Sequence, residues 1–222
     1  DITDYTLGHT LDDIAHYDAS QLFAEVAFEI ALEHNMLGSN NHLDTTSLSV
    51  HGTYDVNDDP SIIEVAHGFS KDHRSDLKQV VLSLVVNGPG SIPLWMEPLD
   101  GNSSDKVSFH ETIKRVEEFR AQIEVETKFK WVADSALYTK DKLLKNNDYR
   151  WITRVPETIA EAKHLVEQPD EEIAWIERGK GYRTSSYSSM YGAIPQRWLL
   201  VFSEQAHHRE RKTLEKKIEK EA

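Results

Sequence analysis

The sequence predicts an α/β domain whose central mixed sheet follows the order β-β-β-α-β-α-β. The first support is a strand over residues 42–52, "HLDTTSLSVHG", where β-favouring residues alternate in character. The second is a pair of apolar runs, at 78–87 and 92–98, which flank the turn Gly88-Pro89-Gly90 and predict a hairpin. The third is the alternation of helical and strand patterns over residues 104–155.

An amphipathic helix precedes the first strand. Asp18 is its expected N-cap, Gln21 completes a weak capping box, and Gly38 is a natural stop. Apolar side chains recur between them at helical spacing, which predicts a helix over residues 19–37. These side chains are Leu22, Phe23, Val26, Ile30 and Met36.

The second half of the sheet alternates helices and strands. Ser104 or Asp105 is expected to cap a helix that runs to about residue 125. Its buried stripe is predicted to consist of Val107, Phe109, Ile113, Val116 and Phe119. Three shorter elements follow, a strand at 129–134, a helix at 136–146 and a strand at 149–155. This is the order of the ribonuclease-H-like fold, in which the first and fourth strands lie side by side.

Two aspartates occupy those neighbouring strands. Asp44 lies in the first strand and Asp134 ends the fourth, so their carboxylates are expected to meet at one edge of the sheet. Carboxylate oxygens suit Mg²⁺ or Mn²⁺, and a pair of such ions can activate a nucleophile and stabilise the leaving oxygen at a phosphodiester. Each residue also has a simpler interpretation, Asp134 as a helix N-cap and Asp44 as a solvent-facing strand residue.

Composition limits the possible classes of protein. The absence of cysteine excludes disulfides, thiolate zinc sites and cysteine nucleophiles. With no apolar run of about 18 residues and no signal-peptide pattern, we expect a cytoplasmic protein with no membrane contact. The formal net charge of −13 argues against a nucleic-acid partner. However, residues 1–70 hold 13 of the 38 acidic residues and no Lys or Arg, so the remaining 25 acids balance all 25 bases. The excess indicates a solvated acidic face or adaptation to salt.

Three stretches resemble the DDE transposases of bacterial insertion sequences, in the IS-four-like cut-and-paste group. They are "HLDTTSLSVHG", "GFSKDHRSDLKQVVLSLVVNGPGSIPLWMEPLDGNSSDK" and "WVADSALYT". The resemblance places the first two catalytic, metal-binding aspartates of that family on Asp44 and Asp134. It implies cleavage and strand transfer of DNA phosphodiesters at element ends, with Mg²⁺ or Mn²⁺ as cofactor. Double-stranded DNA, as terminal repeats and target, is the implied partner of an active homodimer.

The third carboxylate of this family is a glutamate in the pattern Tyr, two residues, Arg, three residues, Glu, six residues, Lys. Arg211 and Glu215 have the Arg-to-Glu spacing, but His208 and Ala222 stand at the Tyr and Lys positions. We therefore expect the glutamate outside this chain, with Glu215 as a weak candidate. The chain is expected to be incomplete at both ends and inactive alone.

The resemblance also suggests a division of the chain, and the mixed charges of residues 71–78 suggest a loop that contacts DNA phosphates or orders the metal site. The expected parts are a helical segment (1–40), a ribonuclease-H-like catalytic core (41–155), part of a β-rich insertion (156–202) and a charged helix (203–222). In the loop "KDHRSDLK", the candidate contacts to DNA phosphates are Lys71, His73, Arg74 and Lys78. A merely solvated loop is an equally good interpretation.

Two other functions remain open at this point. Asp44-Thr45-Thr46-Ser47 resembles phosphate-handling loops of actin-like ATPases and sugar kinases, but it lacks the glycine that lets backbone amides approach a phosphate. A truncated transposase remnant that folds or binds without catalysing is the second alternative.

Overall fold

The computed structural model describes residues 2–54, 62–70, 73–88, 90–103, 105–146 and 148–221. No helix within these ranges is long and apolar enough to cross a membrane. The chain forms two compact units, Asp1–Arg154 and Val155–Ala222. Pro89, Ser104 and the side chain of Val107 lie outside the described part of the chain.

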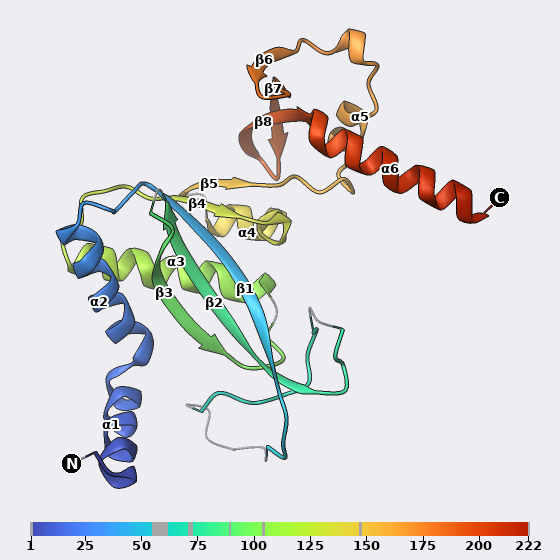
Figure 1. Ribbon diagram of the computed structural model, residues 1–222. Helices are drawn as coiled ribbons and strands as arrows, with labels where there is room; N and C mark the ends of the chain where they lie inside the picture. The colour runs from blue at the N-terminus through green and yellow to red at the C-terminus, as the bar shows by residue number, and fades with distance from the viewer. Residues whose placement is uncertain are drawn as a thin grey trace. The chain divides into compact units, whose positions relative to one another are not determined.

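A five-stranded mixed sheet forms the centre of the first unit (Figure 1). Its strands are β1 (Asn40–Val50), β2 (Lys78–Gly88), β3 (Ile92–Leu99), β4 (Lys130–Ala133) and β5 (Arg150–Thr153). The spatial order is β3-β2-β1-β4-β5, with β1–β2 and β2–β3 antiparallel and β1–β4 and β4–β5 parallel. The predicted ribonuclease-H-like fold is confirmed, including the hairpin and the placement of the first strand beside the fourth.

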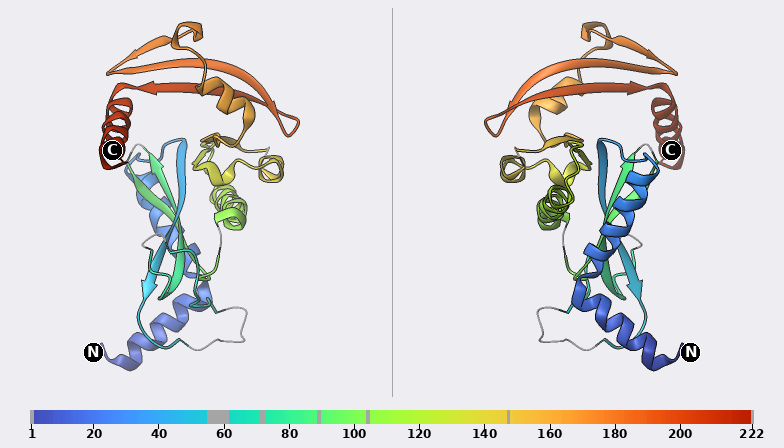
Figure 2. Two further views of the ribbon diagram at one scale, coloured as in Figure 1. Left: turned by 90° about the vertical axis from the view of Figure 1, so that its right-hand side faces the viewer. Right: turned by 90° about the vertical axis from the view of Figure 1, so that its left-hand side faces the viewer.

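One face of the sheet is buried beneath α3 (Asp105–Gln122), which lies along one side of the strands (Figure 2). Leu43 of β1, Val85 of β2 and Trp131 of β4 point into this core, and each is at most 2% exposed. The predicted stripe of α3 is buried against them, as Phe109, Ile113, Val116 and Phe119. Apolar residues at every second strand position and at helical spacing therefore meet in one layer.

The helix α2 (Ala19–Glu33) begins where predicted but ends at Glu33, with His34 as its C-cap, and not at residue 37 before Gly38. Its buried face also differs from the expected one. Val26 and Ile30 are 51% and 46% exposed, whereas the core receives Ala24, Ala27, Phe28 and Ala31. The alanines let the helix backbone approach β3 closely, and the larger side chains turn outward. Phe28 fills the remaining space, with its ring centroid 5.4 Å from that of Phe119 and 6.3 Å from that of Phe129.

Asp18 begins α2 and separates it from α1 (Asp4–Tyr17). Its Oδ1 accepts hydrogen bonds from the backbone N–H groups of Ser20 and Gln21, at 2.9 and 3.2 Å. The predicted N-cap is therefore confirmed. The predicted capping box is wrong, because the Gln21 side chain donates to Glu25 instead, at 3.0 Å.

The single helix predicted over residues 136–146 is also wrong in detail. The chain forms a 3-10 turn, η1 (Ser135–Leu137), and then α4 (Lys140–Lys145). Asp134 caps the first turn, and Thr139 is extended, with φ −127° and ψ 150°, so the helix starts again after it. Both pieces still bury a leucine, Leu137 and Leu143, each 0% exposed.

The second unit is β-rich and ends in a charged helix. Its elements are α5 (Ala160–Val166), η2 (Asp170–Glu172), β6 (Ile176–Gly179), β7 (Tyr182–Tyr191), β8 (Ile194–Ser203) and α6 (Glu204–Glu221). The strands form an antiparallel sheet in the order β6-β7-β8. Arg183 contacts the rings of Trp175 and Phe202, 4.8 and 4.3 Å from their centroids, and pairs with Asp170 at 3.0 Å. Trp175 thus serves the packing of this unit.

Candidate functional site

The pairing of β1 with β4 brings the two predicted aspartates to the same level of the sheet. The ladder runs from Asn40 opposite Lys130 to His42 opposite Val132, a constant offset of 90 residues. Two residues farther along each chain, the same offset matches Asp44 with Asp134. The ladder itself ends at His42 and Val132, so each aspartate stands two residues beyond the last paired rung of strands that lie about 4.8 Å apart.

Strand parity also places both aspartates on the same face. Leu43 and Trp131 point into the core, so Asp44 and Asp134 point the other way, and both are exposed. We call this surface the open face. Its residues on β1, β4 and β5 and just beyond are His42, Asp44, Lys130, Val132, Asp134, Arg150 and Ile152.

Backbone hydrogen bonds orient both carboxylates. Asp44 Oδ1 accepts from the Thr45 N–H at 2.8 Å, and Asp134 Oδ1 accepts from the Ala136 N–H at 2.8 Å. The Thr153 hydroxyl donates to the backbone carbonyl of Asp134, which ties the end of β4 to β5. Asp134 is thus an N-cap as well as one member of the carboxylate pair, and the two roles are compatible.

The donor set suits a hard divalent cation. Two carboxylates from different strands offer oxygen ligands, which Mg²⁺ and Mn²⁺ prefer, and both strands belong to the rigid sheet. Among the described residues, no group of three or more His, Asp or Glu side chains is arranged to hold a metal.

Glu215, the weak candidate for a third carboxylate, lies on α6 in the second unit. Its Oε1 is 3.1 Å from Nε of Arg211, an exposed pair four residues apart. This contact is the ordinary pairing of a charged helix surface.

The predicted DNA-contacting loop lies away from the carboxylate pair. Lys78 is opposite Val50, six residues beyond Asp44 along β1, a separation of ~20 Å at the usual rise of a strand. Lys78 donates to the Tyr54 carbonyl, and Lys71 lies outside the described residues. His73 is exposed, with a left-handed φ of 58°.

Arg74 of that loop is committed to a neighbouring carboxylate. Its Nε and Nη2 donate to the two oxygens of Asp76, each at 2.8 Å. This fork lowers the pKa of Asp76 to about 2. Contact with a phosphate would have to compete with that pairing.

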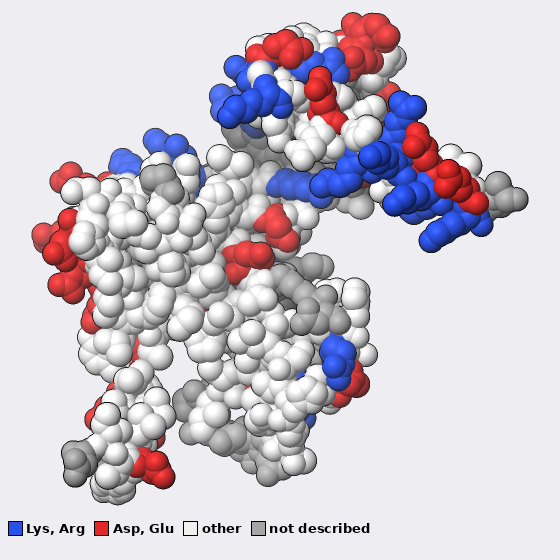
Figure 3. Space-filling model, in the orientation of Figure 1, with Lys and Arg blue, Asp and Glu red and all other residues white. Residues whose placement is uncertain are grey.

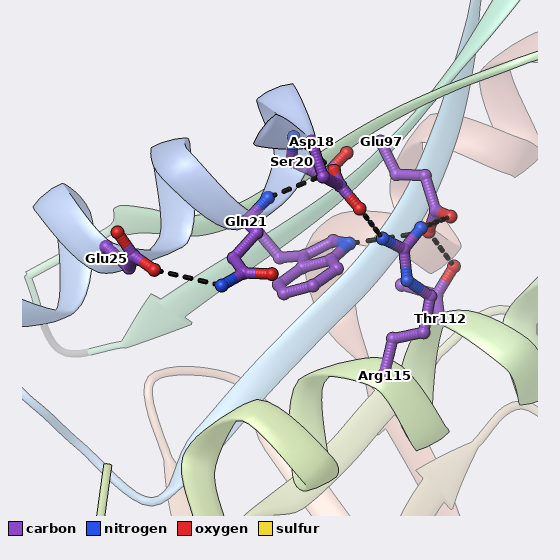
Figure 4. A network of polar contacts seen from close by, with 8 residues as sticks. Asp18, Ser20, Gln21, Glu25, Glu97, Thr112 and Arg115 are labelled. Carbon is purple, nitrogen blue, oxygen red and sulfur yellow. Dashed lines mark hydrogen bonds and ion pairs between the residues drawn. The ribbon is translucent and has the colours of Figure 1, made fainter. Parts of the chain in front are cut away.

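The sequence reasoning missed one acidic residue with a structural role, Glu97 of β3 (Figure 4). Its position is opposite Ser83, on the helix-covered face, and its side chain is only 12% exposed. It accepts hydrogen bonds from Thr112 at 3.2 Å and from the Trp95 indole at 3.3 Å, and it pairs with Arg115. A charged residue inside an otherwise apolar strand was the available signal.

Arg115 extends this network to the start of α2 (Figure 4). Its Nη2 lies 2.6 Å from Oδ2 of Asp18, and its guanidinium stacks over the Trp95 ring at 5.1 Å. One arginine of α3 therefore joins β3 to the N-cap of α2. The network thus joins β3, α3 and the start of α2, with Glu97 on the face of the sheet opposite Asp44.

Comparison with known proteins gives a distant likeness to transposases. No protein-family model and no curated protein matches the chain. The Mos1 transposase paired-end complex with left transposon end aligns over 60% of this chain and 40% of that chain, with 11% identity and a TM-score of 0.36. The piggyBac transposase synaptic complex with hairpin DNA aligns over 73% and 33%, with 11% identity and a TM-score of 0.36.

The catalytic domain of Mos1 mariner transposase aligns over 68% of this chain and 71% of that chain, with 9% identity and a TM-score of 0.34. The chain spans well under half the length of the Mos1 and piggyBac chains in the complexes. Similarity at this level concerns the fold and assigns neither an activity nor a residue to this chain.

Proposed function

We propose that this chain is part of a DDE-type DNA transposase of the IS-four-like group, in which Asp44 and Asp134 hold the catalytic metal ions. The observation that supports the proposal is the register of β1 and β4. Extended by two residues beyond the last paired rung, this register sets both aspartates at one level of a ribonuclease-H-like sheet, which supports the proposal. The three motif-bearing stretches add the resemblance to this group.

In this proposal, bound Mg²⁺ or Mn²⁺ activates the attacking oxygen and stabilises the leaving oxygen at a DNA phosphodiester. The chain supplies the positions of the ligands. Asp44 is fixed within the longest ladder of the sheet, and Asp134 is fixed by its bonds to the first turn after β4. The third carboxylate is proposed to come from outside residues 1–222, which leaves the isolated chain inactive.

The remaining features of the proposal follow the family resemblance. The DNA partners are the terminal repeats of the element and its target, and the active form is a homodimer. The protein is proposed to act in the cytoplasm.

The test is DNA cleavage by the full transposase polypeptide that contains this chain, on a duplex with its terminal repeat, in Mg²⁺ or Mn²⁺. Asp44→Asn and Asp134→Asn should each abolish nicking, because an amide is a poor ligand for a hard cation. Asp141→Asn is the matched control, since Asp141 is an exposed aspartate in the first turn of α4. Undiminished cleavage by either of the first two variants would refute the assignment.

Binding experiments separate the proposal from its alternatives. Titration of the chain with Mn²⁺ should show binding that Asp44→Asn weakens and Asp141→Asn leaves unchanged. Specific ATP binding by calorimetry would favour the kinase-like alternative instead. Metal binding without any cleavage by the full polypeptide would favour a non-catalytic remnant.

A further inference from the structure

Two cations face each other on the open face without a carboxylate between them. Lys130 of β4 and Arg150 of β5 are directly paired in the parallel ladder, and the other neighbour of Lys130 across the sheet is the neutral Asn40. Lys130 is half-buried and Arg150 is exposed. Like charges directly opposite one another destabilise a sheet, so this pair costs stability unless an anion joins it.

Among the residues that the structure describes, no ion pair involves Lys130 or Arg150, although other arginines of this unit, Arg74, Arg115 and Arg120, each have an acidic partner within 4.0 Å. The pair is therefore available for a negatively charged ligand from outside the chain.

A third cation stands at the same edge. Lys128 and Arg150 both line a cavity of about 350 Å³, together with Tyr149 and Phe129. Two acids also line it. Glu117 is held by Arg120 at 2.8 Å and by the Trp131 indole at 2.9 Å, whereas Asp148 is exposed. The free charges at this rim are thus two cations and one carboxylate, next to the Lys130–Arg150 pair.

The charged helix α6 is a weaker candidate for an anion site. Lys and Arg gather along α6 (Figure 3), but acidic residues alternate with them, and Arg211 already pairs with Glu215. A charged helix of this composition is stable in water without a ligand.

We infer that Lys130 and Arg150 clamp a phosphate of the DNA strand that the carboxylate pair acts upon. Four residues separate Lys130 from Asp134 along β4, which corresponds to ~13 Å at the usual strand rise. A DNA strand advances by about 3.4 Å per nucleotide along its axis, so the clamped phosphate lies about four nucleotides from the reacting phosphodiester. This inference rests on the proposed function, because it takes its direction from Asp44 and Asp134.

The first experiment measures binding of the chain to a fluorescent random-sequence duplex by anisotropy, between about 50 and 200 mM salt. A duplex of any sequence suffices, because phosphate contacts carry no sequence information. The Lys130→Gln/Arg150→Gln variant should bind roughly ten- to a hundredfold more weakly at about 100 mM salt, and its salt slope should fall by about 1.8, or 0.9 for each lost contact.

The matched control is Lys114→Gln/Lys163→Gln, which also removes two positive charges. Both lysines are exposed and pair with a glutamate four residues away on their own helix. The control should keep the wild-type salt slope. Thermal unfolding should show the Lys130/Arg150 variant to be at least as stable as the wild type, since it relieves a like-charge repulsion, so weaker binding would not reflect misfolding.

Each outcome decides the inference. A variant with the wild-type slope overturns the clamp and leaves the carboxylate site standing. A wild-type chain without affinity for duplex DNA overturns the clamp, while cleavage by the full polypeptide still tests the proposed function separately. A last test uses DNA that the full polypeptide cleaves, with one phosphate about four nucleotides from the cut replaced by a neutral methylphosphonate. This replacement should weaken DNA binding by the wild type and leave DNA binding by the Lys130→Gln/Arg150→Gln variant unchanged. Equal weakening of both would also overturn it.

Discussion

The alternation of side chains along a strand determines whether an acidic residue of the sheet faces solvent or the helix-covered core. Asp44 and Asp134 project from the open face, where solvent and a cation can reach them. Glu97 projects from the other face, where it is 12% exposed and held by Arg115, Thr112 and Trp95. A shift of one residue along a strand exchanges these two environments, so one carboxylate faces solvent and a chemically similar one is paired inside the protein.

Removal of the arginine from this network should destabilise the first unit. We expect Arg115→Ala to lower the free energy of unfolding by about 2 kcal/mol, because a largely buried Glu97 carboxylate loses its charged partner. Urea denaturation followed by tryptophan fluorescence measures the change.

The neighbouring Lys114→Ala is the control, since it breaks only the exposed pair with Glu118 at 3.8 Å and should cost less than about 0.5 kcal/mol. Adding Glu97→Gln to Arg115→Ala should restore part of the loss. Equal effects of the two alanine variants would contradict a structural role for this network.

The pairing of Arg74 with Asp76 predicts a pH effect. The pKa of Asp76 is lowered from 3.8 to about 2, chiefly by its hydrogen bonds from Arg74. Because the pKa of Asp76 is lower in the folded protein than in the unfolded chain, the ionised carboxylate stabilises the fold at a pH above the unfolded-state pKa. This stabilisation is lost as the pH falls from about 4 towards 2. Arg74→Gln should return the Asp76 pKa towards its ordinary range in an NMR titration. An unchanged titration would show that Arg74 is free for another anion.

At the scale of elements, two loops lock together beside the first rungs of β2. The Gln79 side chain donates to the Gly101 carbonyl at 2.8 Å, and the Gln79 and Ala66 backbones exchange hydrogen bonds at 2.8 and 3.2 Å. Gly101 lies so close that a Cβ atom would stand 1.9 Å from the Gln79 carbonyl oxygen. This contact explains why a glycine stands at position 101, within the long middle stretch of residues 68–106.

Glycine-to-alanine substitutions should therefore have opposite effects at two sites. Gly101→Ala forces Cβ into backbone atoms and should destabilise the protein by about 2–3 kcal/mol. Gly8→Ala, inside the exposed helix α1 with no atom within 4 Å of the new Cβ, should stabilise that helix by about 0.5–1 kcal/mol. Thermal unfolding and far-UV circular dichroism measure both. Destabilisation of equal size at both sites would contradict the locked-loop interpretation.

At the scale of the whole molecule, the core that positions the aspartates belongs to one unit. Every member of the main apolar cluster lies between Phe23 and Trp151, inside Asp1–Arg154. The second unit has its own smaller core, to which Trp198 and Ile194 contribute. The two apolar clusters are therefore each made of residues from one unit.

A polypeptide of residues 1–154 should therefore fold alone. We expect one cooperative unfolding transition and a near-UV circular dichroism spectrum that shows Trp131 and Trp95 in a fixed environment, because both are almost fully buried within this unit. The intact chain is the control. A broad transition without near-UV signal would show that the second unit is needed to order the first.

Periodicity and capping chemistry, which are local, were sufficient for the strands, the helix stripe of α3 and the N-cap at Asp18. They also singled out Asp44 and Asp134, because strand order limits which strands can be neighbours. Local pattern could not reveal that α2 buries its alanines, or that the helix after Asp134 breaks at Thr139. Those features depend on how closely a helix approaches β3 and on which turn follows a capped strand end.

The sequence by itself determined the ribonuclease-H-like order of elements and the two aspartates worth testing. Only the tertiary structure decided that β1 and β4 pair with an offset of 90 residues, that Glu97 is committed to Arg115, and that Lys130 and Arg150 are direct neighbours across the ladder. The physical reason is that pairing offset and strand parity are set by packing between distant segments. A sequence pattern predicts each strand separately, whereas the neighbours of a side chain on the sheet depend on how two strands pair.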